Sequence, residues 1–413
     1  MSVQADVFQL LPCAVQATRV GLQRSGRLFE GKYAVQTTSI VLRELGLSRP
    51  YAHSTPLRIE SISLDPPAEG EVLVKVVGAG LCHSDLSIID ASRPRPLPLV
   101  LGHEGAGEIV ELGVGVRDLA LGDHVVFQFS ASCGRCARCL EGRPQICERH
   151  AIARAKGELM GGGKRFKDAN GARLNHHSGV SCFSEYVVVD RGSLVRIDKE
   201  LPLNEAAIFG CAVMTGVGAV INTARIRPGD KVAVIGLGGV GLNGLLGAIL
   251  GGAGQIIAID INADRLGLAR QLGAHHTVDA TQSGHLAQIL ELSNGGVDFA
   301  FELAGSAKAL QTAYGSVRPG GSVIIAGLAP RDARFEFSPS ELVSGEKSIK
   351  GSYMGSCVPV RDIPRFIQHY RQGRLPIDRL LSETVLFDQM NEGFDRLSAG
   401  TSVRQILMPH GIA

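Results

Sequence analysis

Four of the nine cysteines in this chain of 413 residues are close together in the sequence: Cys133, Cys136, Cys139 and Cys147. Four thiolates in so short a loop can bind one zinc ion tetrahedrally with no open coordination position, which is typical of a structural zinc site. Disulfide pairing and an iron–sulfur cluster are the alternatives, but the run lacks the proline and the spacing of the bacterial ferredoxin pattern. No secretory signal is recognisable, so we expect a reducing compartment, the cytoplasm, and metal-binding cysteines.

A second pattern is glycine-rich. Gly236, Gly238 and Gly241 match the G-x-G-x-x-G fingerprint of dinucleotide-binding proteins, after the apolar run 231–235 and before a helical segment. In such a turn the first glycine permits a tight bend, the second lets the backbone approach a pyrophosphate, and the third lets helix and strand pack closely. The fingerprint therefore predicts a dinucleotide site.

Asp260 ends the next apolar run, nineteen residues after Gly241. A carboxylate at this place accepts hydrogen bonds from the adenosine ribose and repels a 2′-phosphate, so NAD is favoured over NADP. Arg265 would contact the same ribose or a phosphate, or it is a solvated side chain on a helix.

Three dispersed segments carry further metal-binding residue types. They are Cys82 in GLCHSDL, His103 with Glu104 in LGHEGAG, and Cys211 in FGCAVMTG. A catalytic zinc takes three protein ligands and keeps one position open. A single cysteine is more often a small core residue, however, and no spacing relates Cys82 to Cys211 across 128 intervening residues. The residues by themselves leave this second metal site open.

The pattern of apolar runs divides the chain in two. Short β-type runs broken by turns occupy about 39–126, and a polar, glycine-rich stretch over 156–179 is expected to stay irregular. Beyond Cys211, strand-like runs alternate with helical segments, which predicts a parallel sheet wound with helices on both faces. The first part is predicted to have strands over 71–77, 108–112 and 123–127. The second part is predicted to have strands over 232–235, 256–260, 297–301 and 322–326 and helices over 264–272 and 307–316. A helix over 362–371 and a strand over 403–408 are expected to rejoin the first domain.

Charge and hydropathy exclude several classes of function. The net charge of +2, from 42 Lys+Arg against 40 Asp+Glu, leaves no basic footprint for nucleic acid or membrane lipids. The segment 232–259 has no charged residue and is long enough to span a bilayer. Its glycines divide it into strand, turn, helix and strand, so we interpret it as buried parallel structure.

The motifs quoted above occur in the order seen in zinc-containing medium-chain alcohol dehydrogenases, and the chain resembles that family from about Ser39 to its C-terminus. The resemblance implies an α/β protein with a doubly wound Rossmann domain and a mostly β GroES-like catalytic domain. The implied boundaries are an N-terminal extension over 1–36, the catalytic domain over 37–212 with its zinc lobe at 130–150, the NAD domain over 213–354, and a C-terminal part of the catalytic domain over 355–413. The extension is interpreted as a loose tail or as the result of a start codon placed too far upstream, and its faint resemblance to an organelle presequence is the less favoured alternative.

The resemblance also implies roles for individual residues. Cys82, His103 and Cys211 would hold a catalytic zinc, with Glu104 as a nearby alternate ligand and Asp85 orienting His103. The remaining implied positions are Ser84 at the substrate oxygen, Phe129 in the alcohol pocket, Thr215 and Val240 against the nicotinamide, and His83 and Arg404 at the pyrophosphate. The implied reaction is reversible hydride transfer between a primary or secondary alcohol and NAD, with two zinc ions per chain in a homodimer or homotetramer.

Two departures from the family bear on the reaction. A histidine often ends the proton relay three residues after the serine, but this chain has Ser87, so the relay is expected to stop at Ser84 and the cofactor ribose. The stretch 157–185 resembles the branch of glutathione-dependent formaldehyde dehydrogenase, yet Arg93 and Ala151 occupy the positions that bind the glutathione adduct. We therefore expect ordinary alcohols as substrates. The alternatives are the thiol-dependent activity and a redox sensor without turnover.

Overall fold

The computed structural model describes residues 34–411. Almost all of the predicted extension over 1–36 therefore lies outside the described residues, as does Cys13. The long strand β3 (Glu71–Gly80) is central to the first lobe, where it pairs antiparallel with β5 (Gly105–Leu112) and β9 (Tyr186–Asp190). The sheet continues through β6 (His124–Phe127), β10 (Leu194–Ile197), β17 (Leu381–Val385) and β18 (Arg404–Leu407).

A second, five-stranded sheet completes this lobe. Its order is β7-β2-β1-β4-β8. The segment 156–179 is predicted to be irregular, but it contains two strands of two residues each. These strands form because the backbone of the segment pairs with β2 and β4. The strands are β1 (Val35–Leu42), β2 (Leu57–Leu64), β4 (Leu99–Val100), β7 (Phe166–Lys167) and β8 (Asn175–His176).

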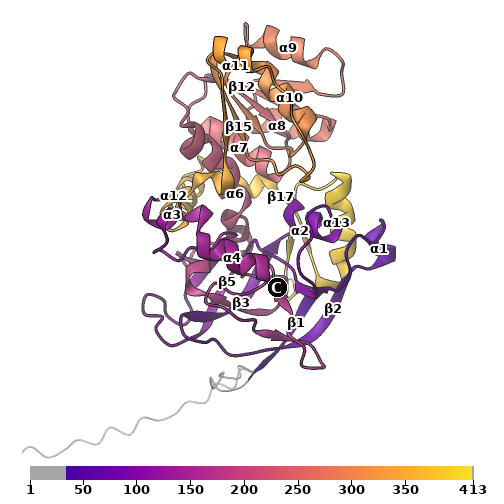
Figure 1. Cartoon of the computed structure of the whole chain (residues 1–413), viewed down its shortest axis with the longest axis vertical. Helices are drawn as coiled ribbons and strands as arrows, with labels where there is room; N and C mark the ends of the chain where they lie inside the picture. Colours follow the sequence, from indigo (N-terminus) through magenta and orange to yellow (C-terminus); the bar gives the residue numbers. More distant parts are fainter. Residues whose placement is uncertain (1–33, 412–413) are drawn as a thin grey trace, which may run out of the picture. The chain divides into compact units, whose positions relative to one another are not determined.

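The second lobe is built on a six-stranded sheet in which all neighbours are parallel, in the order β13-β12-β11-β14-β15-β16. Helices α7, α8 and α10 pack against its strands, as the upper part of Figure 1 shows. This confirms the predicted doubly wound fold. The strands are β11 (Lys231–Ile235), β12 (Gln255–Asp260), β13 (His276–Asp279), β14 (Val297–Glu302), β15 (Val317–Ile325) and β16 (Ser348–Gly351). The helices are α7 (Gly239–Leu250), α8 (Ala263–Leu272), α9 (His285–Leu292) and α10 (Ala307–Ser316).

The strand order reverses between β11 and β14, which are neighbours in the sheet but not in the sequence. In doubly wound sheets a ligand binds beyond the carboxyl ends of the strands at this switch point. The fold therefore places the dinucleotide site at the end of β11, where the glycine-rich turn begins.

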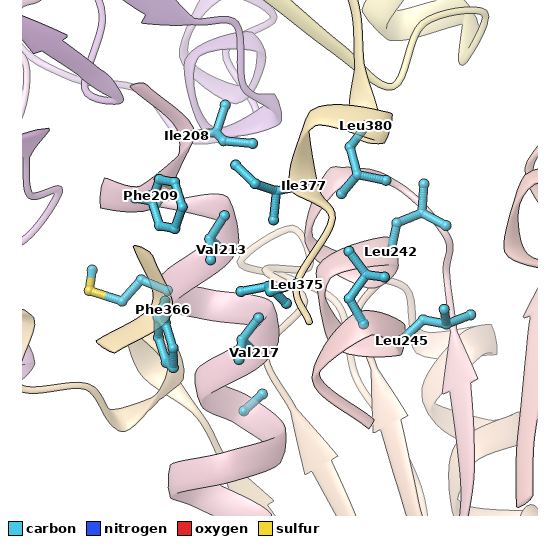
Figure 2. Close-up of a cluster of buried hydrophobic side chains, with 14 of the residues drawn as sticks. Ile208, Phe209, Val213, Val217, Leu242, Leu245, Phe366, Leu375, Ile377 and Leu380 are labelled. Carbon is cyan, nitrogen blue, oxygen red and sulfur yellow. The ribbon is translucent and has the colours of Figure 1, made fainter. Parts of the chain in front are cut away.

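A buried apolar cluster joins helices of both parts of the chain (Figure 2). It connects α6 (Ala212–Gly218) and α7 with the C-terminal helix α12 (Pro359–Arg371). Side chains of this size each contribute about 1.5–3 kcal/mol when fully buried. The cluster includes Ile208, Phe209, Val213, Val217, Leu242, Leu245, Phe366, Leu375, Ile377 and Leu380.

Helices α6 and α7 approach closely at Gly216, where a Cβ atom would collide with the backbone of Val240 and Gly244. No single described helix is long and apolar enough to cross a membrane. One pair bent by 51°, Leu203–Gly210 with Ala212–Ala224, meets the criteria of length and composition together.

Candidate functional site

Three turns bring the dispersed metal-binding residues together. Cys82 precedes helix α2 (His83–Ile89), His103 and Glu104 lie between β4 and β5, and Cys211 precedes α6. Their ligand atoms all lie within 4.8 Å of one another, and all four side chains are buried. Two thiols, an imidazole and a carboxylate at this separation fit a zinc ion. The structure thus joins residues that the sequence could not relate by spacing.

Asp85 positions the imidazole of this cluster from the first turn of α2. Its carboxylate lies 3.1 Å from His103 Nδ1 and accepts a hydrogen bond from the backbone N–H of Gly102 at 3.2 Å. With Nδ1 engaged, His103 Nε2 faces Cys211 Sγ at 3.5 Å. A carboxylate that fixes the ring in this way sets which nitrogen is free to bind a metal.

The local electrostatics favour an ionised thiol. A hydrogen bond from the Cys211 thiol and the nearby His103 hold the pKa of Cys82 well below its usual range, against the opposing effect of burial. Burial acts to lower the pKa of His103, but the Asp85 carboxylate raises it well above its ordinary value. Since thiolates are the metal-binding form of cysteine, the lowered pKa of Cys82 suits a cation at the cluster, and a metal would displace the proton from His103 and bind the neutral imidazole.

Glu104 and Arg404 form a buried ion pair behind the cluster. Arg404 Nη1 lies 3.0 Å from Glu104 Oε2, with side-chain exposures of 3% and 0%. The same nitrogen donates to the carbonyl of Leu81 at 3.3 Å. Burial raises the pKa of Glu104 to about 7 although Arg404 acts to lower it. This arginine couples the start of strand β18 to the metal-binding residues.

The glycine-rich turn fits a dinucleotide. Gly236 has a φ of +87°, and a Cβ atom at Gly241 would collide with the carbonyl of Gly236, so both positions require glycine. A Cβ atom at Gly238 would meet no atom within 4 Å, which leaves its backbone open to a ligand. Arg404 Nε is a buried donor with no partner among residues 34–411, and it faces Gly239. Free N–H groups and an unpaired guanidinium nitrogen suit a pyrophosphate.

Asp260 closes β12 beside this turn. Its carboxylate accepts hydrogen bonds from the backbone N–H groups of Leu237 at 2.6 Å and Asn262 at 2.9 Å. Asp260 is thereby fixed at the edge of the cavity, where a ribose would lie. Arg265 also reaches the cavity.

One cavity of about 530 Å³ contains most of the predicted site residues. His103 and Glu104 are fully buried beside Cys82 and Cys211 and do not line it, while Gly241 packs inside the turn. Ser87 also lines the cavity, and its hydroxyl donates to the carbonyl of His83 at 2.8 Å. The predicted residues that line it are Cys82, His83, Ser84, Phe129, Cys211, Thr215, Gly236, Gly238, Val240, Asp260, Arg265 and Arg404.

The four clustered cysteines form a separate site. Their sulfur atoms all lie within 4.8 Å of one another, and Cys136 Sγ is 3.9 Å from Cys147 Sγ. Thiolates bound tetrahedrally at about 2.3 Å from zinc are separated by about 3.8 Å. Backbone N–H groups of Cys139 and Glu148 lower the pKa of Cys136 to about 6. All cysteines of the described residues are free thiols, so the arrangement fits a metal and not disulfides.

We expect Cys139→Ala to lower the zinc content by one ion per chain and the thermal midpoint by more than about 5 °C, because a structural metal contributes directly to folding free energy. Metal analysis and calorimetry measure the two effects. The control is Arg138→Ala, an exposed neighbour that pairs with Glu141 at 2.8 Å and should change neither value appreciably. A folded Cys139→Ala protein of unaltered stability would rule out a structural zinc.

Sequence reasoning missed several residues around the cavity. His177 is buried, with Nδ1 at 3.0 Å from Asp85 Oδ1 and its ring centroid at 5.0 Å from that of His103. Tyr353 lines the cavity and accepts a hydrogen bond from Arg154 at 2.6 Å. No local motif marks these residues, because their contacts with the site arise only from the tertiary fold.

A dinucleotide turn and a buried metal-binding cluster that share one cavity define a metal-dependent, nucleotide-linked dehydrogenase. The chain matches two protein families, the alcohol dehydrogenase GroES-like domain over residues 68–199 and the zinc-binding dehydrogenase domain over 239–372. Together these matches span more than half of the chain. They coincide with the β-rich lobe and the parallel-sheet lobe respectively.

Two relatives are S-(hydroxymethyl)glutathione dehydrogenases. The Paracoccus denitrificans protein is 35% identical over 86% of this chain and 96% of its own length, and that of Synechocystis sp. is 38% identical over 85% and 96%. Among solved structures, an alcohol dehydrogenase zinc-binding domain protein from Burkholderia ambifaria superposes with a TM-score of 0.86 at 35% identity, covering 91% of this chain and 100% of its own. Benzyl alcohol dehydrogenase from Acinetobacter calcoaceticus gives 0.81 at 33% identity, covering 91% and 99%.

The chain therefore belongs to the zinc-containing medium-chain alcohol dehydrogenase family, and it is an oxidoreductase. The fold class and the resemblance inferred from its sequence are confirmed.

Proposed function

We propose that this chain oxidises primary or secondary alcohols reversibly with NAD, without a thiol carrier, and binds two zinc ions. The observation that carries the proposal is the convergence of Cys82, His103 and Cys211 at the cavity that also contains the glycine-rich turn. Zinc in such a three-ligand site polarises an alcohol oxygen, and nicotinamide supplies the hydride acceptor.

The chain's own residues orient and enclose the reacting groups. Asp85 holds His103 in one orientation, and the Phe129 ring packs against that imidazole with centroids 4.8 Å apart. Phe129 is buried and apolar, so it excludes water from this side of the cavity. Ser84 Oγ is the proposed acceptor of the alcohol proton, and it would release its own hydroxyl proton through the cofactor ribose to water, because a neutral hydroxyl cannot keep a second proton. The proposed relay ends at Ser84 and the cofactor ribose, since the Ser87 hydroxyl is bonded to its own helix.

A second candidate is glutathione-dependent formaldehyde oxidation, suggested by the names of the two relatives. Arg93 lines the cavity, whereas Ala151 is an exposed residue of α4 (Glu148–Lys156). The residues at the two adduct-binding positions therefore favour the first candidate.

The test is zinc content per chain together with NAD reduction on a panel of alcohols, with and without glutathione. Two zinc ions and thiol-independent oxidation support the proposal. Activity only with glutathione would establish the second candidate, and a zinc-poor protein without turnover would indicate a sensor. A cytoplasmic location and a homodimer or homotetramer are further proposals that rest on the sequence alone.

We expect Asp260→Asn to raise the NADP-to-NAD ratio of kcat/KM by about tenfold or more, because one negative charge no longer repels the 2′-phosphate. Asparagine retains a side-chain oxygen that can accept one of the two backbone hydrogen bonds. Asp264→Asn, at an exposed position of α8, removes an equal charge nearby and is the matched control. Equal ratios in the two variants would refute the role of Asp260.

A further inference from the structure

Four arginines gather around the side of the cavity formed by Phe129 and Tyr353. Arg93 lines the cavity itself. Arg154 donates from Nη1 to the Tyr353 hydroxyl at 2.6 Å, and its guanidinium lies over the Phe129 ring, 5.7 Å from the centroid. Arg95 and Arg331 are close enough to belong to the group, because Arg331 acts electrostatically on both Arg93 and Arg95, and Arg93 and Arg154 act on Arg95.

None of the four forms an ion pair with a carboxylate of residues 34–411. Several other partly buried arginines have acidic partners, although Arg265, at the cofactor side of the cavity, has none within the described part of the chain. Those pairs are Arg43–Glu60, Arg165–Glu71 and Arg396–Glu383. Burial, followed among the cationic groups by Arg154 and Arg331, lowers the pKa of Arg93, against an opposing contribution from Tyr353. Burial, then Arg154 and Arg93, likewise lower the pKa of Arg95.

Unpaired like charges in partial burial destabilise a protein, and a bound anion offsets that cost. The guanidinium group presents a planar set of N–H donors that matches a carboxylate or a phosphate bidentately. Arg93 is half-buried and lines the same cavity as Cys211 and Ser84. An anionic group bound there can therefore belong to a molecule whose other end lies in the reaction site.

We infer that the alcohol oxidised by this enzyme carries a carboxylate or phosphate, which Arg93 binds within the positive field of Arg95, Arg154 and Arg331. The inference rests on the proposed function and narrows its substrate class. The experiment must distinguish two sources of the anionic group. The first is a small hydroxy acid or hydroxyalkyl phosphate, and the second is a glutathione adduct with its peptide carboxylates.

The kinetic test compares ω-hydroxycarboxylates and ω-hydroxyalkyl phosphates with unsubstituted alcohols of equal chain length, and formaldehyde with glutathione as a separate arm. We expect kcat/KM for the anionic member to exceed that of the neutral one by about tenfold or more, with a preference that weakens as salt is raised. Arg93→Gln should reduce this ratio by about tenfold. Arg58→Gln, an exposed arginine of β2, is the matched control and should preserve the ratio.

A binding measurement on the zinc-loaded, full-length protein separates this inference from the proposed function. Calorimetry would compare an alkanoate with the alkanamide of equal length. Tighter binding of the alkanoate that is lost in Arg93→Gln supports the inference even if no alcohol is oxidised, an outcome that would overturn only the proposed function. Alkanoate binding that is equal in wild type and Arg93→Gln, or equal turnover of anionic and neutral alcohols, overturns the inference. Turnover of the glutathione adduct alone, dependent on Arg93, assigns the anionic group to glutathione.

Discussion

The Cys211→Ala enzyme is expected to retain its fold and its NAD affinity while kcat falls to below about a thousandth of the wild-type value. A catalytic zinc contributes several kcal/mol of charge stabilisation to the transition state, and each 1.4 kcal/mol is about a tenfold change in rate. Cys211 lies between the short helix Ala207–Gly210 and α6, and its thiol faces His103 Nε2 at 3.5 Å. Its removal breaks the cluster without touching the glycine-rich turn.

Turnover, calorimetric NAD binding, zinc content and circular dichroism are measured on the same preparation. Cys357→Ala is the matched control, because Cys357 is also a fully buried thiol, and it donates to the carbonyl of Met214 at 3.3 Å. The control should lose some stability and keep its turnover. If Cys211→Ala unfolds, or if it turns over as fast as the control, the assignment of Cys211 to a catalytic metal is wrong.

The parallel sheet could be predicted wherever its strands are buried on both faces. The strands at 231–235 and 255–260 appear in the sequence as apolar runs between glycines, and the helix predicted at 307–316 matches α10 at both ends. The outer strands β13 and β16 could not be found in this way. They lie at the two ends of the sheet, and most of their side chains are at least partly exposed, so no apolar run marks them.

In the candidate site, too, the residues that could be predicted from the sequence are those whose arrangement is local. The four-cysteine loop and the glycine-rich turn are local, so their residue spacing already predicts their chemistry. Cys82 and Cys211 meet only because the segment after β3 and the start of α6 lie beside each other, and resemblance to a family was needed to relate them. His177 and Arg154 were not predicted by either route. Both contact residues of the site from segments with no pattern that distinguishes a functional histidine or arginine from a surface one.

Arg404→Leu is expected to destabilise the protein by about 3 kcal/mol, because it leaves the carboxylate of Glu104 buried without a counter-charge. Both side chains of the pair are inaccessible to solvent, and their charged atoms are 3.0 Å apart. We expect a value toward the lower end of the range for buried pairs. The pKa of Glu104 is already about 7, so near neutral pH the carboxyl can take up a proton instead of remaining charged.

The urea-unfolding midpoint at fixed zinc concentration measures this effect. Adding Glu104→Gln to Arg404→Leu should recover more than about 1 kcal/mol, since the unpaired charge is then gone. Arg318→Leu is the matched control. Arg318 pairs with Asp298 at 2.5 Å on the surface, and losing that pair should cost less than about 1 kcal/mol. If Arg404→Leu costs no more than this control, the buried pair does not stabilise the fold. Cofactor binding would then explain the arginine at this position, because its unpartnered Nε faces the glycine-rich turn.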